Sequence, residues 1–136
     1  MKTKLRRFGV AIPEDLLFRF DRYIKNKSYK NRSEAIRDLI RAEFVREVIA
    51  TNKESWGVVS IVYDHHKREL VDKVVDIQHN YQKIVVASQH VHLNHNNCLE
   101  VIIAHGKTKE IKMLASKLQS VKGVEHTTLS FTSVVE

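Results

Sequence analysis

The stretch SQHVHLNHNNCLE, residues 88–100, contains three of the eight histidines and the only cysteine of this 136-residue chain. His90 and His92 are two residues apart, so their side chains share one face if the segment is a β-strand. A turn through residues 93–97 would return Cys98 along the neighbouring strand. Two imidazoles and one thiolate that converge in this way suit a soft or borderline transition metal. The stretch therefore predicts a metal site on a hairpin.

Three ligands leave the coordination of such a metal incomplete, and the chain offers further histidines. His79 lies near the end of an expected helix and is not evidently adjacent to the hairpin in its own chain, so a partner subunit could supply it. Glu100 follows Cys98 by two residues on the same strand face; it would either orient a metal ligand or remain an exposed charge. The candidates for the fourth ligand are His65, His66, His79, His95, His105 and His126.

Two groups of elements would position these side chains, and the division between them follows the charge. Residues 1–50 carry 13 Lys and Arg against 7 Asp and Glu, whereas residues 51–136 carry 10 against 9 and hold all eight histidines. We expect a short polar linker over residues 51–56, followed by the order βαββαβ over 57–136, which is the ferredoxin-like arrangement of an α+β, ACT-type domain. The expected strands are 56–65, 83–93, 97–106 and 124–135, and the expected helices are 67–82 and 107–121.

The basic N-terminal half predicts a DNA-binding domain that cannot be stable as a monomer. Phe8, Val10 and Ile12 alternate with other residues as in a half-buried strand, and two amphipathic helices follow. Asn31 or Ser33 is placed to cap the second of these helices. One short strand and two helices bury too little apolar surface alone, so this half must pair with a second copy. A basic, dimeric βαα unit is the ribbon-helix-helix plan, whose two strands enter the major groove of DNA.

The composition predicts the cellular compartment of the protein. The hydrophobic content of 43% is enough for a core, and the formal net charge is +7. One cysteine cannot form a disulfide within the chain, which suits a reducing cytoplasm. The sequence contains no apolar run of membrane-spanning length, and its first residues, MKTKLRRFGV, lack the apolar core of a signal peptide. We therefore expect a cytoplasmic protein that is not bound to a membrane.

At this point the motifs match a family. The chain resembles the nickel-responsive ribbon-helix-helix repressors, the NikR family, over nearly its whole length. The resemblance rests on NRSEAIRDLIR, IVYDHHKREL, DIQHNYQ and HVHLNHNNCLEV, of which the last is the most specific. It implies a homotetramer, arranged as a dimer of dimers, with one Ni(II) per subunit held in a plane. The ligands that it implies are His90, His92 and Cys98 of one chain and His79 of a neighbouring chain.

The resemblance also implies a second cation site and a set of DNA contacts. Glu34 and Asp38 match the family's carboxylates for the second site; they are four residues apart and share a helix face with arginines that could pair with them instead. On the DNA side, Arg7, Gly9 and Ala11 would face the groove, and Arg32 and Ser33 would hold phosphates. The family commonly has hydroxyl residues where this chain has Gly9 and Ala11, so less hydrogen bonding to bases is expected from those two positions.

These observations predict a nickel-responsive, sequence-specific DNA-binding repressor, and the family's usual targets are genes for nickel uptake. The alternative is a ribbon-helix-helix regulator that responds to a different metal or to a small molecule, because βαββαβ domains also serve as amino-acid sensors. An enzyme is not expected, because no general base or nucleophile accompanies the metal ligands.

Overall fold

The computed structural model of the chain describes residues 3–134. The chain divides into two compact units, Met1–Ala42 and Glu43–Glu136, and the division falls within a long helix, α2 (Arg32–Ala50). This point lies earlier in the sequence than the linker over residues 51–56. The assignment of a DNA-binding domain to residues 1–50 and of a regulatory domain to residues 57–136 stays a prediction.

The first unit contains α1 (Glu14–Asn26) and the beginning of α2. Pro13 directly precedes α1, where its missing N–H costs no helical hydrogen bond, and Glu14 and Asp15 lie in the first turn. At the start of α2 the side chain of Asn31 accepts a hydrogen bond of 2.9 Å from the backbone N–H of Glu34. Of the two capping residues that the sequence offered, Asn31 makes this contact.

The segment that precedes α1 differs from the expected strand. Within the described residues of this single chain, 3–13 form no helix or strand. The side chains of Phe8, Val10 and Ile12 are 73%, 64% and 37% exposed. A lone extended segment has no neighbour to receive its backbone hydrogen bonds, so a ribbon can form only when a second strand is present. The alternating apolar side chains therefore form a surface that is exposed in the single chain.

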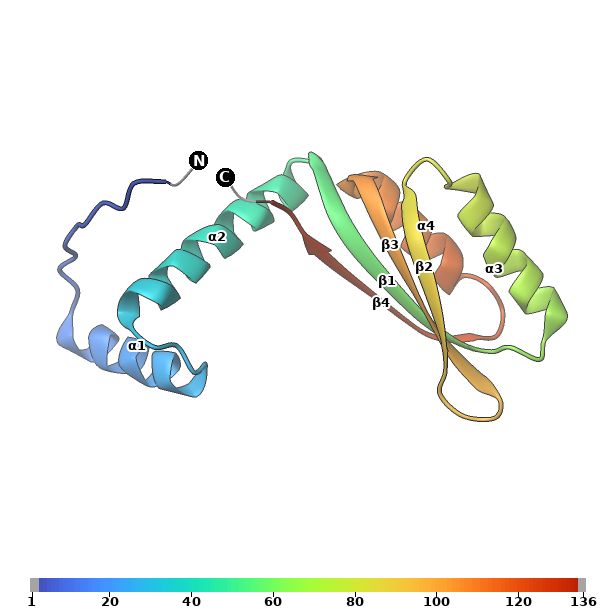
Figure 1. Cartoon of the computed structure of the whole chain (residues 1–136), viewed down its shortest axis with the longest axis horizontal. Coiled ribbons are helices and arrows are strands. Elements are labelled where there is room, and N and C mark those ends of the chain that lie inside the picture. Colours follow the sequence, from blue (N-terminus) through green and yellow to red (C-terminus); the bar gives the residue numbers. More distant parts are fainter. Residues whose placement is uncertain (1–2, 135–136) are drawn as a thin grey trace. The chain divides into compact units, whose positions relative to one another are not determined.

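The second unit has the predicted order of elements and is an α+β structure (Figure 1). Its four strands form one antiparallel sheet in the order β2-β3-β1-β4. The elements are β1 (Glu54–Asp64), α3 (Arg68–Asn80), β2 (Val85–His92), β3 (Asn97–Lys107), α4 (Thr108–Gln119) and β4 (Val124–Thr132). Each lies where the apolar pattern placed it, with ends that differ by a few residues. No helix among residues 3–134 is long and apolar enough to span a membrane.

One face of the sheet carries the core, and the apolar side chains of the other face are only partly covered within the described residues. Along β1 alternate residues are buried against α3 and α4, among them Val59, Ile61 and Tyr63. Gly57 is required on this face, since a Cβ there would come within 2.5 Å of the Ile111 side chain of α4. The opposite face presents apolar side chains of which Ile103 is exposed and the others are partly buried: Trp56, Val58, Val62, Leu99, Val101 and Ile103.

The strand register decides which side chains meet near the β2–β3 turn. His92 pairs with Cys98 and His90 pairs with Glu100 across β2 and β3, while Tyr63 of β1 pairs with Cys98 from the other side. The turn is closed by a hydrogen bond of 2.9 Å from the N–H of Leu93 to the carbonyl of Asn97. Paired residues of neighbouring strands point to the same face, so these side chains all point to the helix-covered side.

Candidate metal centre

The hairpin brings together the three donors that its sequence suggests. Cys98 is fully buried in β3. Its Sγ lies 3.0 Å from Nε2 of His90 and 3.9 Å from Nδ1 of His92. Donors bonded to one metal at about 2.0–2.3 Å are separated by roughly 3–4 Å, so each imidazole lies at ligand spacing from the thiol. The rings of His90 and His92 are farther apart, with centroids separated by 5.7 Å. Their role as metal ligands remains a prediction that this spacing favours.

The protonation of Cys98 follows from its surroundings. Burial raises the pKa of the Cys98 thiol, and the carboxylates of Glu100 and Asp64 raise it further. Without a cation the sulfur therefore keeps its proton. A metal that binds as a thiolate complex must displace this proton, so metal affinity and pH are linked at this residue.

Glu100 is a buried carboxylate and not an exposed strand charge. The residue is 7% exposed, and its carboxylate accepts a hydrogen bond of 2.8 Å from the hydroxyl of Tyr63. The side-chain amide of Gln78 on α3 donates a second hydrogen bond to it. The other ring nitrogen of His90, Nδ1, lies 3.7 Å from Glu100 Oε1. The Glu100 carboxylate thus lies near Nδ1 of His90, the ring nitrogen that does not contact the Cys98 sulfur. There it favours the tautomer that carries its proton on Nδ1 and leaves Nε2 free to bind a metal.

Tyr63 and Gln78 were not singled out by the sequence. Burial and the neighbouring Glu100 carboxylate raise the pKa of the Tyr63 hydroxyl, so that the hydroxyl stays protonated and continues to donate. Gln78 immediately precedes His79 in α3. Neither residue type indicates a role by itself. Only the pairing of β1 with β3, and the position of α3 over the sheet, place them against Glu100.

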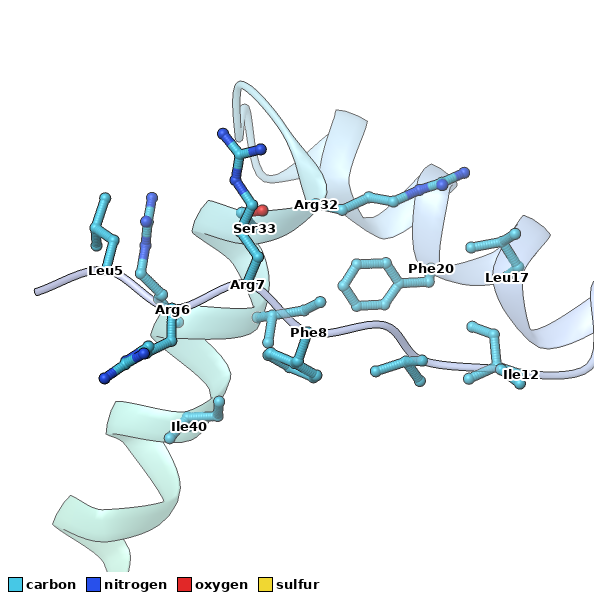
Figure 2. A pocket seen from close by; sticks show the side chains of 14 residues that line it. Leu5, Arg6, Arg7, Phe8, Ile12, Leu17, Phe20, Arg32, Ser33 and Ile40 are labelled. Carbon is cyan, nitrogen blue, oxygen red and sulfur yellow. The ribbon is translucent and has the colours of Figure 1, made fainter.

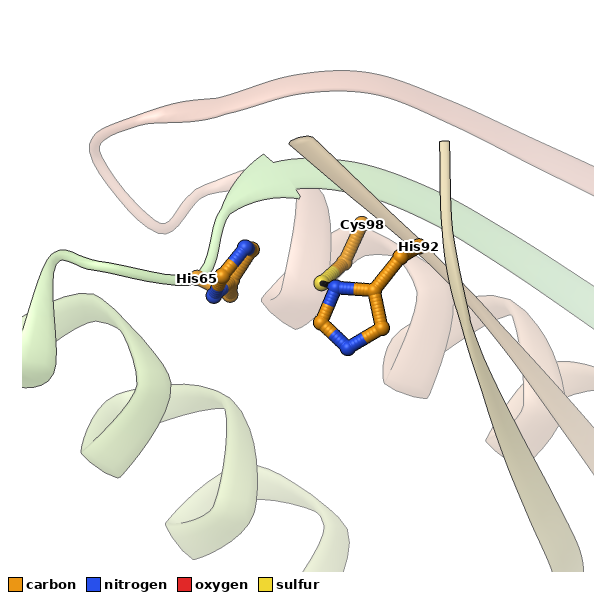
Figure 3. Close-up of side chains that lie close together, drawn as sticks. All are labelled: His65, His92 and Cys98. Carbon is orange, nitrogen blue, oxygen red and sulfur yellow. Dashed lines mark hydrogen bonds between the residues drawn. The ribbon is translucent and has the colours of Figure 1, made fainter. Parts of the chain in front are cut away.

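His79 does not join these donors within the described part of its own chain. It is exposed at the C-terminal end of α3 and lies outside the cluster of possible ligands. His65 does lie beside two of them, since the cluster of possible ligands contains His65, His92 and Cys98 but not His90. Atoms of His65, His92 and Cys98 that can bind a metal all lie within 4.8 Å of one another (Figure 3). The sequence offered His65 only as one of six candidates, because nothing local shows that the end of β1 reaches the hairpin.

In the N-terminal unit, four of the five predicted DNA contacts line a groove, and Gly9 does not. The groove has a volume of about 730 Å³ and is lined by the segment before α1 and by both helices (Figure 2). Arg7, Ala11 and Ser33 line it, together with Phe8 and Val10. In the single chain, the apolar residues and the residues predicted to contact DNA therefore line the same protein groove. They would lie on opposite faces only if the segment formed a regular strand, so the set of DNA contacts remains a prediction.

Arg32 also lines this groove, and it already has a partner. Its Nε and Nη2 donate to the two carboxylate oxygens of Asp21, each at 2.9 Å. This pairing lowers the pKa of the Asp21 carboxyl group. The guanidinium group has five N–H donors, so three remain for a phosphate. The ion pair joins α1 to the start of α2, and it limits how freely Arg32 can reach another anion.

The proposed second cation site shows ordinary ion pairing. Asp38 contacts Nη1 of Arg41 at 3.4 Å, and its carboxylate raises the pKa of the Tyr29 hydroxyl. Glu34 is half-buried and lies one turn away on the same helix. Asp38 therefore already has two neighbours that an ordinary surface carboxylate would have, and the second cation site stays a prediction.

Known proteins resemble the chain across both units. The NikR C-terminal nickel-binding domain family matches residues 56–132. A protein from Chlorobium phaeobacteroides is 48% identical over 96% of this chain and 98% of its own length. Proteins from Trichlorobacter lovleyi and Pyrococcus abyssi are 50% and 48% identical, each over 95% of this chain and 94% of its own length. All three bear the name "Putative nickel-responsive regulator".

A solved structure of an uncharacterized protein from Thermotoga maritima shares the fold alone. It has a TM-score of 0.50 and 12% identity, and the match covers 59% of this chain and 96% of the other.

Proposed function

Because this chain belongs to the NikR family of nickel-responsive regulators, we propose that it is a transcriptional repressor that binds operator DNA when nickel is bound. The family is a class of regulators and not of enzymes. The proposal assigns the protein to the cytoplasm and makes nickel-uptake genes its targets. The observation that carries it is the approach of His90 and His92, on an exposed strand, to the buried thiol of Cys98 and the buried Glu100 carboxylate.

The proposed nickel site is completed by another subunit. His90, His92 and Cys98 of one chain and His79 of the partner subunit would hold one Ni(II), for which mixed imidazole and thiolate donors in a plane are suitable. Two observations support this arrangement. Both hairpin imidazoles approach the Cys98 sulfur, and His79 is exposed and lies outside the cluster of possible ligands in its own chain. A metal bound in this way would join subunits.

The partly exposed sheet face supports assembly. The apolar side chains between Trp56 and Val62 on β1 and between Leu99 and Ile103 on β3 form a surface that a second copy would cover. In the N-terminal unit, the same segment of a second chain would pair with this one and cover the exposed side chains of Phe8 and Val10 and the groove beside them. Both surfaces fit a dimer of dimers, which we propose as the working form.

The path from the metal to the rest of the protein would run through α3. Gln78 on α3 donates to Glu100, which in turn faces His90, and His79 is the next residue along α3. Ligation of His79 by the neighbouring hairpin would therefore fix one end of α3 from both sides. We propose that this ordering favours the arrangement of DNA-binding dimers that fits the operator.

On DNA, the proposal gives different tasks to different residues. Arg7, Gly9 and Ala11 would face bases in the major groove once the ribbon has formed, and only Arg7 can make two hydrogen bonds to guanine. Arg32 and Ser33, at the N-terminal end of α2, would hold phosphates. Glu34 and Asp38 would form a second, weaker cation site.

The decisive experiment uses metal-free, full-length protein. Addition of Ni(II) should produce a thiolate-to-metal absorption band that saturates at one equivalent per chain, and sedimentation should show a tetramer. Selection from random duplexes should then yield a common sequence with Ni(II) present and none without it. Absence of the absorption band would refute the nickel site. Selection that succeeds equally without nickel, or only with another ligand, would favour the alternative regulator.

A further inference from the structure

The outer face of α4 carries lysines that neither the proposed nickel site nor the proposed base contacts use. We propose that this lysine face binds the phosphate backbone of the DNA that the protein occupies, without reading its sequence. The inference rests on the proposed function in that the partner is DNA. The lysine face consists of Lys109, Lys112, Met113, Ser116, Lys117 and Ser120, which line a shallow depression.

The six residues share one side of the helix because of their spacing. They are separated by three or four residues, or by a single residue at each of two steps, which is the pattern of one helix face. All six are exposed. The opposite side of α4 holds Ile111, Leu114 and Leu118, which are fully buried in the core under the sheet. The fold therefore fixes the lysine face on the outside of the second unit.

The lysines of this face have no ion partner among residues 3–134. The ion pairs within that range join other groups, and none includes Lys109, Lys112 or Lys117. Glu110 is the only acidic residue of α4, and its carboxylate lies beside Gly106 of β3. The lysine face thus presents its positive charges to the solvent without neutralisation.

The other helix that covers the sheet, α3, provides the contrast (Figure 1). Its exposed side mixes charges of both signs, since Glu69, Asp72 and Asp76 accompany Lys73, and Lys73 lies 3.5 Å from Glu69. Opposite charges one turn apart attract each other, as on an ordinary solvated helix. On α4, like charges one turn apart repel each other instead. An anion that spans the lysine face would remove this repulsion.

A DNA backbone matches the lysine face in charge and in extent. Ammonium groups and serine hydroxyls both donate hydrogen bonds to phosphate oxygens, whatever the base sequence. With a rise of about 1.5 Å per residue, Lys109 and Lys117 are roughly 12 Å apart along the helix axis. Phosphates of one strand follow each other about every 3.4 Å along the DNA axis. The lysine face is therefore long enough for more than one phosphate.

The start of α4 is fastened to the segment that leads from the proposed DNA-binding half. The side-chain oxygen of Asn52 accepts a hydrogen bond of 2.8 Å from the backbone N–H of Lys109. The carbonyl of Lys53 accepts one of 3.1 Å from the hydroxyl of Thr108. Asn52 and Lys53 follow directly after α2, whose first turn is proposed to hold phosphates. A weak phosphate-binding surface that is attached to a bound domain acts at a high effective concentration, so it adds to the affinity for DNA.

The test measures the DNA affinity of the full-length, nickel-loaded protein over a range of salt concentrations. A double variant, Lys112→Gln with Lys117→Gln, should weaken binding to operator and random duplexes by the same factor. The slope of log affinity against log salt should become shallower by about one for each lost phosphate contact, hence by about two for each lysine face on the duplex. Nickel affinity and thermal melting should not change.

The matched control is Lys73→Gln with Lys83→Gln, which removes the same charge from exposed positions outside the lysine face and should leave the slope unchanged. An unchanged slope in the Lys112 and Lys117 double variant would overturn the inference, as would an equal loss in the control. Lost binding to phosphatidylglycerol vesicles with unchanged DNA binding would also overturn it and assign the face to a membrane surface. If the wild-type protein selects no operator with Ni(II), the proposed function fails instead, while random duplexes still test the lysine face.

Discussion

Substitution of Glu100 by glutamine tests whether the carboxylate behind the hairpin stabilises both the fold and the metal site. Glu100 is buried and accepts hydrogen bonds from Tyr63 and Gln78. A hydrogen bond to a charged group contributes about 1.5–3 kcal/mol, and glutamine would replace one accepting oxygen by an N–H₂ group that faces a donor. We therefore expect the free energy of unfolding of the metal-free protein to fall by about 2–3 kcal/mol.

For nickel affinity, two effects of Glu100→Gln oppose each other. The carboxylate raises the pKa of Cys98, so its removal makes the thiolate easier to form. Burial is the larger cause of that raised pKa, however, and it remains in the variant. Removal of the charge also leaves His90 without the carboxylate behind its Nδ1, and losses of this kind weaken metal binding by about 10–100-fold. We expect the second effect to dominate and nickel binding to weaken.

The assay is a Ni(II) competition titration against a chelator at fixed pH, combined with urea unfolding of the metal-free protein. Tyr63→Phe is the matched control, because it removes one hydrogen bond and keeps the charge; its nickel affinity should fall less than that of Glu100→Gln. If Glu100→Gln binds nickel as tightly as the wild type, or more tightly, the main effect of the carboxylate is to raise the pKa of the Cys98 thiol. Its assigned role in supporting His90 would then be wrong.

Four further predictions follow from the same contacts. Because its raised pKa keeps Cys98 protonated, each bound Ni(II) should release one thiol proton. Above pH 7 the nickel affinity should therefore rise about tenfold per pH unit until the pKa of the thiol is reached. Calorimetry in buffers of different ionisation enthalpy would count the released protons. A His79→Ala variant mixed with Cys98→Ala should recover some complete nickel sites after subunit exchange, and no recovery after proven exchange would favour a site within one chain. Arg7→Ala should reduce discrimination between operator and random DNA by about 1–3 kcal/mol, and an equal loss on both duplexes at fixed salt would make Arg7 a phosphate contact. Gly9→Thr should fold normally, since an added Cβ meets nothing within 4 Å, and should change the selected DNA sequence if Gly9 faces the bases.

The sequence predicted the second unit well because its elements are encoded locally. Alternating apolar residues give β1 and β3, helical spacing gives α3 and α4, and the polar turn after His92 allows only a close hairpin. Once the hairpin is expected, the approach of Cys98 to the two histidines follows from the two-residue period of a strand. Family resemblance selected His79 from the six candidates for the fourth ligand, and its role stays a prediction.

The remaining contacts depend on long-range register or on a second chain. His65 reaches the hairpin, and Tyr63 reaches Glu100, only because β1 pairs with β3 in one particular alignment. The ion pair of Arg32 with Asp21 joins residues that are eleven apart across a loop. The expected strand over residues 8–12 is absent from the described single chain, because the hydrogen-bond partners of that strand would belong to another copy.

The position of the fourth metal ligand gives a physical basis for distinguishing one cation from another. A ligand shifts a conformational equilibrium only as far as it binds one state more tightly than the other. A cation held only by donors of one chain binds separated and joined subunits alike. In the proposed nickel site, by contrast, the cation also binds His79 of the partner subunit, so its binding energy depends on how the subunits are arranged. Under the proposed function, only a cation of this second kind can change the arrangement of the DNA-binding dimers.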